Sequence, residues 1–101
     1  MSRFAVFYRP ARADFIDGPT EFEQQKVSEH FEYLKQALEA RQLLHAGRTM
    51  TNAPVGVGIF EAESPEAAQA FIDSDPVVAS GVFVAEVHPY RVALMQGVEP
   101  G

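Results

Sequence analysis

Residues 61–90, EAESPEAAQAFIDSDPVVASGVFVAEVHPY, constrain the fold more than any other part of the chain. Ser64-Pro65-Glu66 is typical of a helix start, because serine caps the first turn, proline fits it and glutamate complements the helix dipole. Asp75-Pro76 repeats this signal, and Gly81 favours a left-handed exit after a single turn. The β-forming residues over 82–87 then predict a strand. The stretch therefore predicts a helix, a short helical turn and a strand, in that order.

The chain before this stretch predicts three more strands and one long helix. Residues 3–9 carry apolar side chains on both sides, which indicates a strand covered on both faces. Apolar residues then recur at helical spacing from Thr20 or Glu21 to about Arg41. Short apolar runs over 42–46 and 55–60 indicate the two remaining strands.

The order strand–helix–strand–strand–helix–strand predicts an α+β fold, a ferredoxin-like βαββαβ sandwich with two helices on one face of an antiparallel sheet. We expect a single domain over residues 1–96 and a flexible tail over 97–101, after a possible extra strand that begins at Arg91. A lone sheet with apolar residues on both faces would leave one of them in water. We therefore expect a homodimer through the sheet face.

Two features indicate room for a ligand. Gly56 and Gly58 lie on one side of their strand and leave space for a ligand, or merely for a close backbone or a helix. The loop over 10–20 is long enough to arch over a pocket, although an ordinary surface loop is the alternative.

Composition excludes several classes of function. The formal charge of −6 disfavours nonspecific binding to nucleic acid or to an anionic membrane. The absence of cysteine excludes disulfides, thiolate zinc sites and a cysteine nucleophile. No apolar run is long enough for a membrane span, and the sequence passes from Met1 directly into a strand pattern instead of a signal peptide. We expect a cytoplasmic protein.

Five motifs, taken in order, resemble the YCII-related (YciI-like) family, small proteins of the dimeric α+β barrel superfamily. Together the motifs span nearly the whole chain. The family typically has a proline where this chain has Arg48, which affects the expected shape of the pocket. The motifs are His30-Phe31-x-Tyr33-Leu34, Leu43-Leu44-His45-Ala46-Gly47, Glu61-Ala62-Glu63-Ser64-x-Glu66-Ala67-Ala68, Asp75-Pro76-x-Val78-x-x-Gly81-Val82-Phe83 and Pro89-Tyr90.

The resemblance implies a dimeric α+β barrel and an active site that pairs a helix histidine with the aspartate of the Asp-Pro motif. In this sequence these residues are His30 and Asp75. Related families of the superfamily include lactone isomerases and dehalogenating enzymes of aromatic degradation. Most YCII-like members have no assigned reaction, so the resemblance does not supply a substrate.

The two residue types suit acid–base chemistry. An imidazole titrates near neutral pH, and a carboxylate on its other nitrogen fixes the tautomer and raises its basicity. Each residue also has a structural interpretation. His30 borders the apolar stripe of its helix, where a histidine is often only packed, and Asp75 before a proline is a common helix cap.

Further candidates for substrate binding are Arg9, Tyr8 and Arg48. A guanidinium offers a bidentate fork to a carboxylate, although most arginines are simply solvated. Tyr8 would donate a hydrogen bond into the same pocket, with a core aromatic as the alternative. The histidines and glutamates lack the tight spacing of recognised zinc motifs, so we expect no metal and no cofactor.

The sequence thus predicts a small cytoplasmic homodimeric enzyme of lyase, isomerase or hydrolase type. It would act on a small cyclic or aromatic-derived substrate with His30 and Asp75. The alternative is a noncatalytic dimeric ligand-binding or interaction module, in which the two residues merely fix a helix junction. A haem-handling relative of the same superfamily is a third possibility, but no particular residue indicates it.

Overall fold

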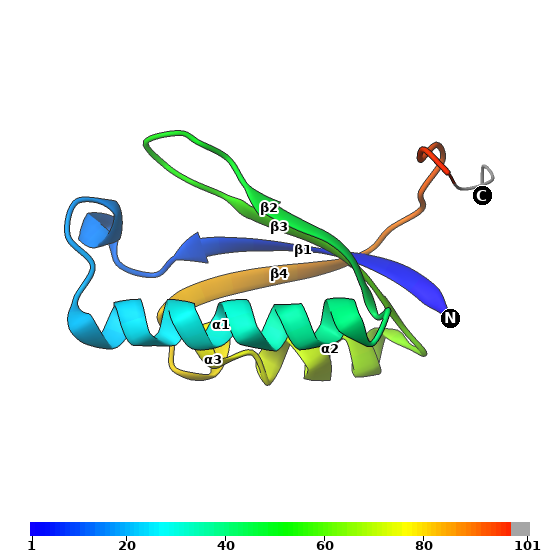
Figure 1. Ribbon diagram of the computed structural model, residues 1–101, viewed down its shortest axis with the longest axis horizontal. Coiled ribbons are helices and arrows are strands. Elements are labelled where there is room, and N and C mark those ends of the chain that lie inside the picture. Colours follow the sequence, from blue (N-terminus) through cyan, green and yellow to red (C-terminus); the bar gives the residue numbers. More distant parts are fainter. Residues whose placement is uncertain (98–101) are drawn as a thin grey trace.

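An antiparallel sheet covered on one face by helices forms the structure, a computed structural model that describes residues 1–97 (Figure 1). The strands lie in the order β2-β3-β1-β4, and each neighbouring pair is antiparallel. This arrangement confirms the predicted ferredoxin-like α+β fold. The elements are β1 (Ser2–Pro10), the 3-10 turn η1 (Ala13–Ile16), α1 (Glu21–Glu39), β2 (Leu43–Arg48), β3 (Gly56–Ala62), α2 (Pro65–Asp73), α3 (Pro76–Ala79) and β4 (Phe83–Pro89).

The helices begin at the residues that the sequence indicates. Thr20 and Glu23 form a reciprocal capping box at the start of α1. Ser64 accepts a hydrogen bond from the Ala67 N–H at the start of α2. The single turn of α3 is followed by Gly81 with φ of 79°, a left-handed conformation that glycine adopts without a steric penalty. Local chemistry therefore accounts for the starts of α1 and α2 and for the end of α3.

The core lies between the sheet and the helices. Alternation along β1 directs Phe4, Val6 and Tyr8 toward the helix side, where they are buried. Phe60 packs beside Phe4 with 5.9 Å between ring centroids. The helices complete this cluster with Leu34, Ala37, Ala68, Ile72 and Val77.

Small residues hollow the sheet on its helix side. The register aligns Arg48 of β2 with Gly56 of β3, and Gly56 with Tyr8 of β1. A Cβ atom at Gly56 would lie 3.2 Å from the Tyr8 Cβ, and one at Gly58 would lie 3.0 Å from the Val6 Cγ1. The two glycines therefore allow the neighbouring side chains of β1 to approach β3 closely. Because glycine has no side chain, β3 also projects nothing toward the helices at these two positions.

The apolar stripe of α1 is less buried than its periodicity predicts. Leu34 is buried, but Phe31 and Leu38 remain 65% and 51% exposed. Both residues line a cavity between α1 and the sheet, which is consistent with their exposure. The sequence pattern correctly placed these residues toward the sheet but did not reveal the empty space.

The chain after β4 forms no further strand element up to Gly97, in contrast to the possibility of an extra strand from Arg91. Val92, in this segment, is buried, with 9% of its surface exposed. Most of the expected flexible tail, residues 98–101, lies outside the described residues. Within residues 1–97, no helix is long and apolar enough to cross a membrane.

Candidate active site

The structure brings His30 and Asp75 together across 45 positions of sequence. The His30 Nδ1 lies 2.7 Å from the Asp75 Oδ2. His30 projects from the middle of α1, and Asp75 is the N-cap of α3. The second carboxylate oxygen of Asp75, Oδ1, accepts a hydrogen bond from the Val77 N–H at 3.2 Å. One carboxylate therefore caps a helix and holds an imidazole at the same time.

Burial makes this pair stronger than a surface contact. Asp75 is 0% exposed, and the His30 side chain is 16% exposed. A buried carboxylate requires hydrogen-bond donors, and Asp75 has three of them. The third donor is the Tyr8 hydroxyl, which lies 3.0 Å from the Asp75 Oδ2.

Tyr8 acts as a permanent donor to this carboxylate. Burial, followed by the charge of Asp75 and the hydrogen bond to it, raises the pKa of the Tyr8 phenol well above its ordinary value. The hydroxyl therefore keeps its proton at physiological pH. Tyr8 therefore donates to Asp75 and does not act as a proton acceptor.

The carboxylate determines which ring nitrogen of His30 carries the proton. A carboxylate accepts hydrogen bonds, so the proton of the neutral ring belongs on Nδ1, the atom that faces Asp75. The Nε2 atom is then left with a free lone pair. A neutral ring in this tautomer can accept a proton at Nε2.

Aromatic rings hold the imidazole in position. The Tyr8 ring meets His30 edge to face, with centroids 5.0 Å apart and planes at 75°. Phe83 of β4 makes a similar contact at 5.9 Å and 77°. Such perpendicular contacts favour one ring orientation.

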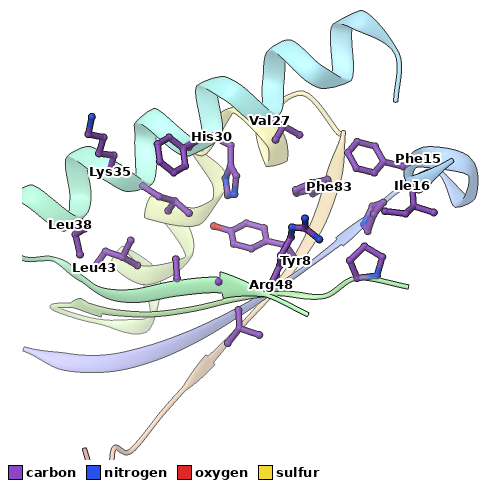
Figure 2. Close-up of a pocket in the computed structure, with 18 residues that line it drawn as sticks. Tyr8, Phe15, Ile16, Val27, His30, Lys35, Leu38, Leu43, Arg48 and Phe83 are labelled. Atoms are coloured by element: carbon purple, nitrogen blue, oxygen red, sulfur yellow. The ribbon is translucent and has the colours of Figure 1, made fainter. Parts of the chain in front are cut away.

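His30 and Tyr8 form part of the wall of a cavity of about 580 Å³ between α1 and the sheet (Figure 2). Its size lies in the range of pockets that hold one small organic molecule. Apart from these two residues the wall is largely apolar. The larger apolar side chains in the wall include Phe15, Ile16, Val27, Phe31, Leu34, Leu38, Leu43 and Phe83.

The loop before α1 takes part in this cavity. Phe15 and Ile16, both in η1, line one end of it, and the Phe15 ring meets Phe83 edge to face at 5.4 Å. The loop thus contributes side chains to one end of the cavity wall, whereas the sequence left open whether it is an ordinary surface loop or covers a pocket. The sequence signal was only the length of the loop, and it did not single out Phe15.

The three predicted substrate-binding residues lie in different places. Tyr8 and Arg48 line the cavity, whereas Arg9 does not. The Arg9 Nη1 lies 3.3 Å from the Glu86 Oε1 on the opposite face of the sheet. The reason is the alternation of a strand, because Tyr8 and Arg9 are adjacent and must point to opposite faces. The structure therefore separates Arg9 from His30.

Metal-binding groups are not clustered in the described part of the chain. Among residues 1–97, no three His, Asp or Glu side chains lie close enough to hold a metal ion. Glu86 and His88 approach each other at 3.2 Å, but they form an exposed pair on the open sheet face.

Comparison with known proteins identifies related sequences and folds. The family model for the YCII-related domain matches residues 3–91. Among solved structures, the chain is similar to 5-chloro-2-hydroxyhydroquinone dehydrochlorinase from Burkholderia phenoliruptrix AC1100, in complex with 2,5-dihydroxybenzoquinone. The TM-score is 0.64 at 20% sequence identity, over 87% of this chain and 93% of that one. No curated protein matches the sequence.

Proposed function

Because the chain belongs to the YCII-related family, we propose that it is a small enzyme that transfers protons on a cyclic or aromatic-derived substrate with His30 and Asp75. One observation carries this proposal. The His30 imidazole lies in the wall of a largely apolar cavity, and its Nδ1 lies 2.7 Å from a buried carboxylate. A merely structural histidine would not need an adjoining cavity large enough for a ligand.

In the proposed reaction, the lone pair of the His30 Nε2 removes a proton from a hydroxyl group or a carbon atom of the substrate. The electron pair that is left behind moves into the ring of the substrate. The proton is then returned at a ring carbon, which is an isomerisation. If that carbon bears a leaving group, ionisation of a second ring hydroxyl can expel the group from the now saturated carbon as an anion, which is an elimination. Asp75 stabilises the imidazolium that forms, and neither outcome requires an oxidant.

The structural likeness favours the elimination. The similar protein is named as a dehydrochlorinase of a chlorinated hydroxyhydroquinone and holds a dihydroxybenzoquinone. Loss of hydrogen chloride requires a base for the proton and an apolar site for the ring, and both are present in this chain. We therefore propose halogenated and hydroxylated rings as the first substrates to test.

The test is chloride release from 5-chloro-2-hydroxyhydroquinone, followed by a panel of other halogenated ring compounds and small lactones. His30→Gln is expected to lower kcat at least about a hundredfold, since a positioned general base contributes on that order. His45→Gln is the matched control, because His45 is an exposed residue that does not line the cavity. Equal turnover by both variants, or binding without turnover on every compound, would refute catalysis by His30 and favour a ligand-binding module.

We propose further that the protein acts as a homodimer in the cytoplasm. The sheet face opposite the helices carries Phe7, Ile59 and Val84, as the strand register and alternation place them. No helix or strand within residues 1–97 covers this face (Figure 1). A second copy would remove these apolar side chains from water. The lack of cysteine means that the fold needs no oxidising compartment.

A further inference from the structure

The cavity is lined by basic side chains, although the molecule as a whole is acidic. The chain has 14 acidic and 8 basic residues. Among residues 1–97, however, no aspartate or glutamate lines the cavity, while His30, Lys35 and Arg48 do. The carboxylate of Asp75 lies behind His30 and Tyr8, which both hydrogen-bond to it. A ligand in the cavity therefore meets basic side chains against an apolar wall.

Arg48 is one of the basic residues in the described part of the chain that no carboxylate neutralises. Within residues 1–97, the Arg48 side chain forms no ion pair and no hydrogen bond. Four other basic side chains form ion pairs with glutamates. The four are Arg3, Arg9, Arg12 and Lys26.

The strand register points Arg48 toward the site. Arg48 lies in line with Gly56 and Tyr8 across three strands, so its side chain is on the helix side of the sheet. Since Gly56 has no side chain, the long arginine can lie across it toward Tyr8. Arg48 and Tyr8 both line the cavity, and Figure 2 shows the amino group of Lys35 pointing away from His30.

We propose that the ligand of this cavity is an organic anion, an apolar ring that carries a carboxylate. The ring lies against Phe83 and Phe15, with a reacting atom at the His30 Nε2. The carboxylate lies on the guanidinium of Arg48, whose planar fork binds a carboxylate in a bidentate manner. This inference rests on the proposed function of His30 and adds the substrate class to it.

A matched pair of probes tests the inference. 2,5-Dihydroxybenzoate carries a negative charge at neutral pH, and its methyl ester keeps the same ring without that charge. Calorimetric titration should show tighter binding of the benzoate by about tenfold, the contribution of one partly solvent-exposed charge-assisted contact. This preference should decrease with added salt, because the arginine is exposed.

Three variants locate the preference. Arg48→Gln should remove the roughly tenfold difference between the two probes, and Arg48→Lys should restore part of it, since the charge returns without the fork. Arg41→Gln makes the same change of net charge at an exposed residue outside the cavity and should keep the full preference. Because Arg48 is exposed, its replacement should leave the fold intact, which far-UV circular dichroism checks.

The possible results separate this inference from the proposed function. Equal binding of the two probes, no binding of either, or an unchanged preference in Arg48→Gln overturns the anion site. The proposed function is judged separately by turnover in His30→Gln. A protein that depends on His30 for turnover and binds both probes equally would keep the reaction and lose the anionic substrate.

Discussion

At the scale of single residues, Asp75 is the residue on which the site depends. Its two oxygens satisfy three donors, which come from α3, α1 and β1. The sequence predicted the cap because an aspartate before Pro76 is a local signal. Asp75 and His30 are 45 positions apart in the sequence, and only the family resemblance indicated that they are in contact. The Tyr8 hydrogen bond to Asp75 was not predicted at all, because no local pattern marks it.

Tyr8→Phe should reveal how much the buried carboxylate depends on its third donor. Loss of a hydrogen bond to a buried charge should lower the free energy of unfolding by about 2 kcal/mol. Tyr33→Phe is the control, because the Tyr33 hydroxyl donates at 2.6 Å to the neutral carbonyl of Phe71. Its removal should cost about 1 kcal/mol. Urea denaturation measures both, and an equal or smaller loss in Tyr8→Phe would contradict the account.

At the scale of helices and strands, the sequence predicted the helix caps more readily than the register of the strands. The starts of α1, α2 and α3 follow from Thr20, Ser64 and Asp75, since a cap acts on the N–H groups of its own first turn. The side on which Arg48 lies was not predictable. Leu43 and Arg48 are five positions apart and would normally face opposite sides, but an irregularity between Leu43 and His45 shifts the register.

The Glu23 carboxylate at the start of α1 should make the protein less stable as the pH becomes acidic. A hydrogen bond from Arg12 lowers the pKa of Glu23 to about 2, and the Thr20 N–H supports the same charge. Because the folded pKa lies below the ordinary value of 4.5, the contribution of Glu23 to stability is complete above about pH 4.5. It is lost as the pH falls toward 2.

Glu23→Gln tests this pH dependence. Thermal unfolding should show the wild type more stable than the variant at neutral pH, and the difference should shrink as the pH falls toward about 2, where the Glu23 carboxyl of the folded protein begins to take up its proton. Glu39→Gln, at the other end of α1, serves as the control. A difference between wild type and Glu23→Gln that stays constant from neutral pH to pH 2 would exclude this explanation.

At the scale of the whole molecule, the helices bury one face of the sheet and build the cavity on that side. The other face combines Phe7 and Ile59 with the ion pairs of Arg3 and Arg9. The sequence predicted apolar residues on this face correctly, because successive side chains of a strand point to opposite faces and β1 has consecutive apolar residues. What covers the face is a property of the assembly and stays a prediction.

Sedimentation velocity at micromolar concentration is expected to show a dimer. Phe7→Glu should give a monomer, since a charge would be buried in an interface of about 800 Å² per partner. Val84→Glu, at a side chain that is 56% exposed, repeats the test with less risk to folding. Phe22→Glu on the helix side should remain dimeric. A wild-type monomer would refute the predicted assembly.

The most direct test of the central claim is nitrogen NMR of the His30 imidazole in the wild type and in Asp75→Asn. We expect the neutral wild-type ring to carry its proton on Nδ1 and to present a free lone pair at Nε2. We further expect 2,5-dihydroxybenzoquinone to shift the Nε2 signal and Asp75→Asn to change the balance of tautomers. A wild-type ring protonated on Nε2, or a tautomer unaffected by Asp75→Asn, would contradict the assignment of His30 as a base set by Asp75.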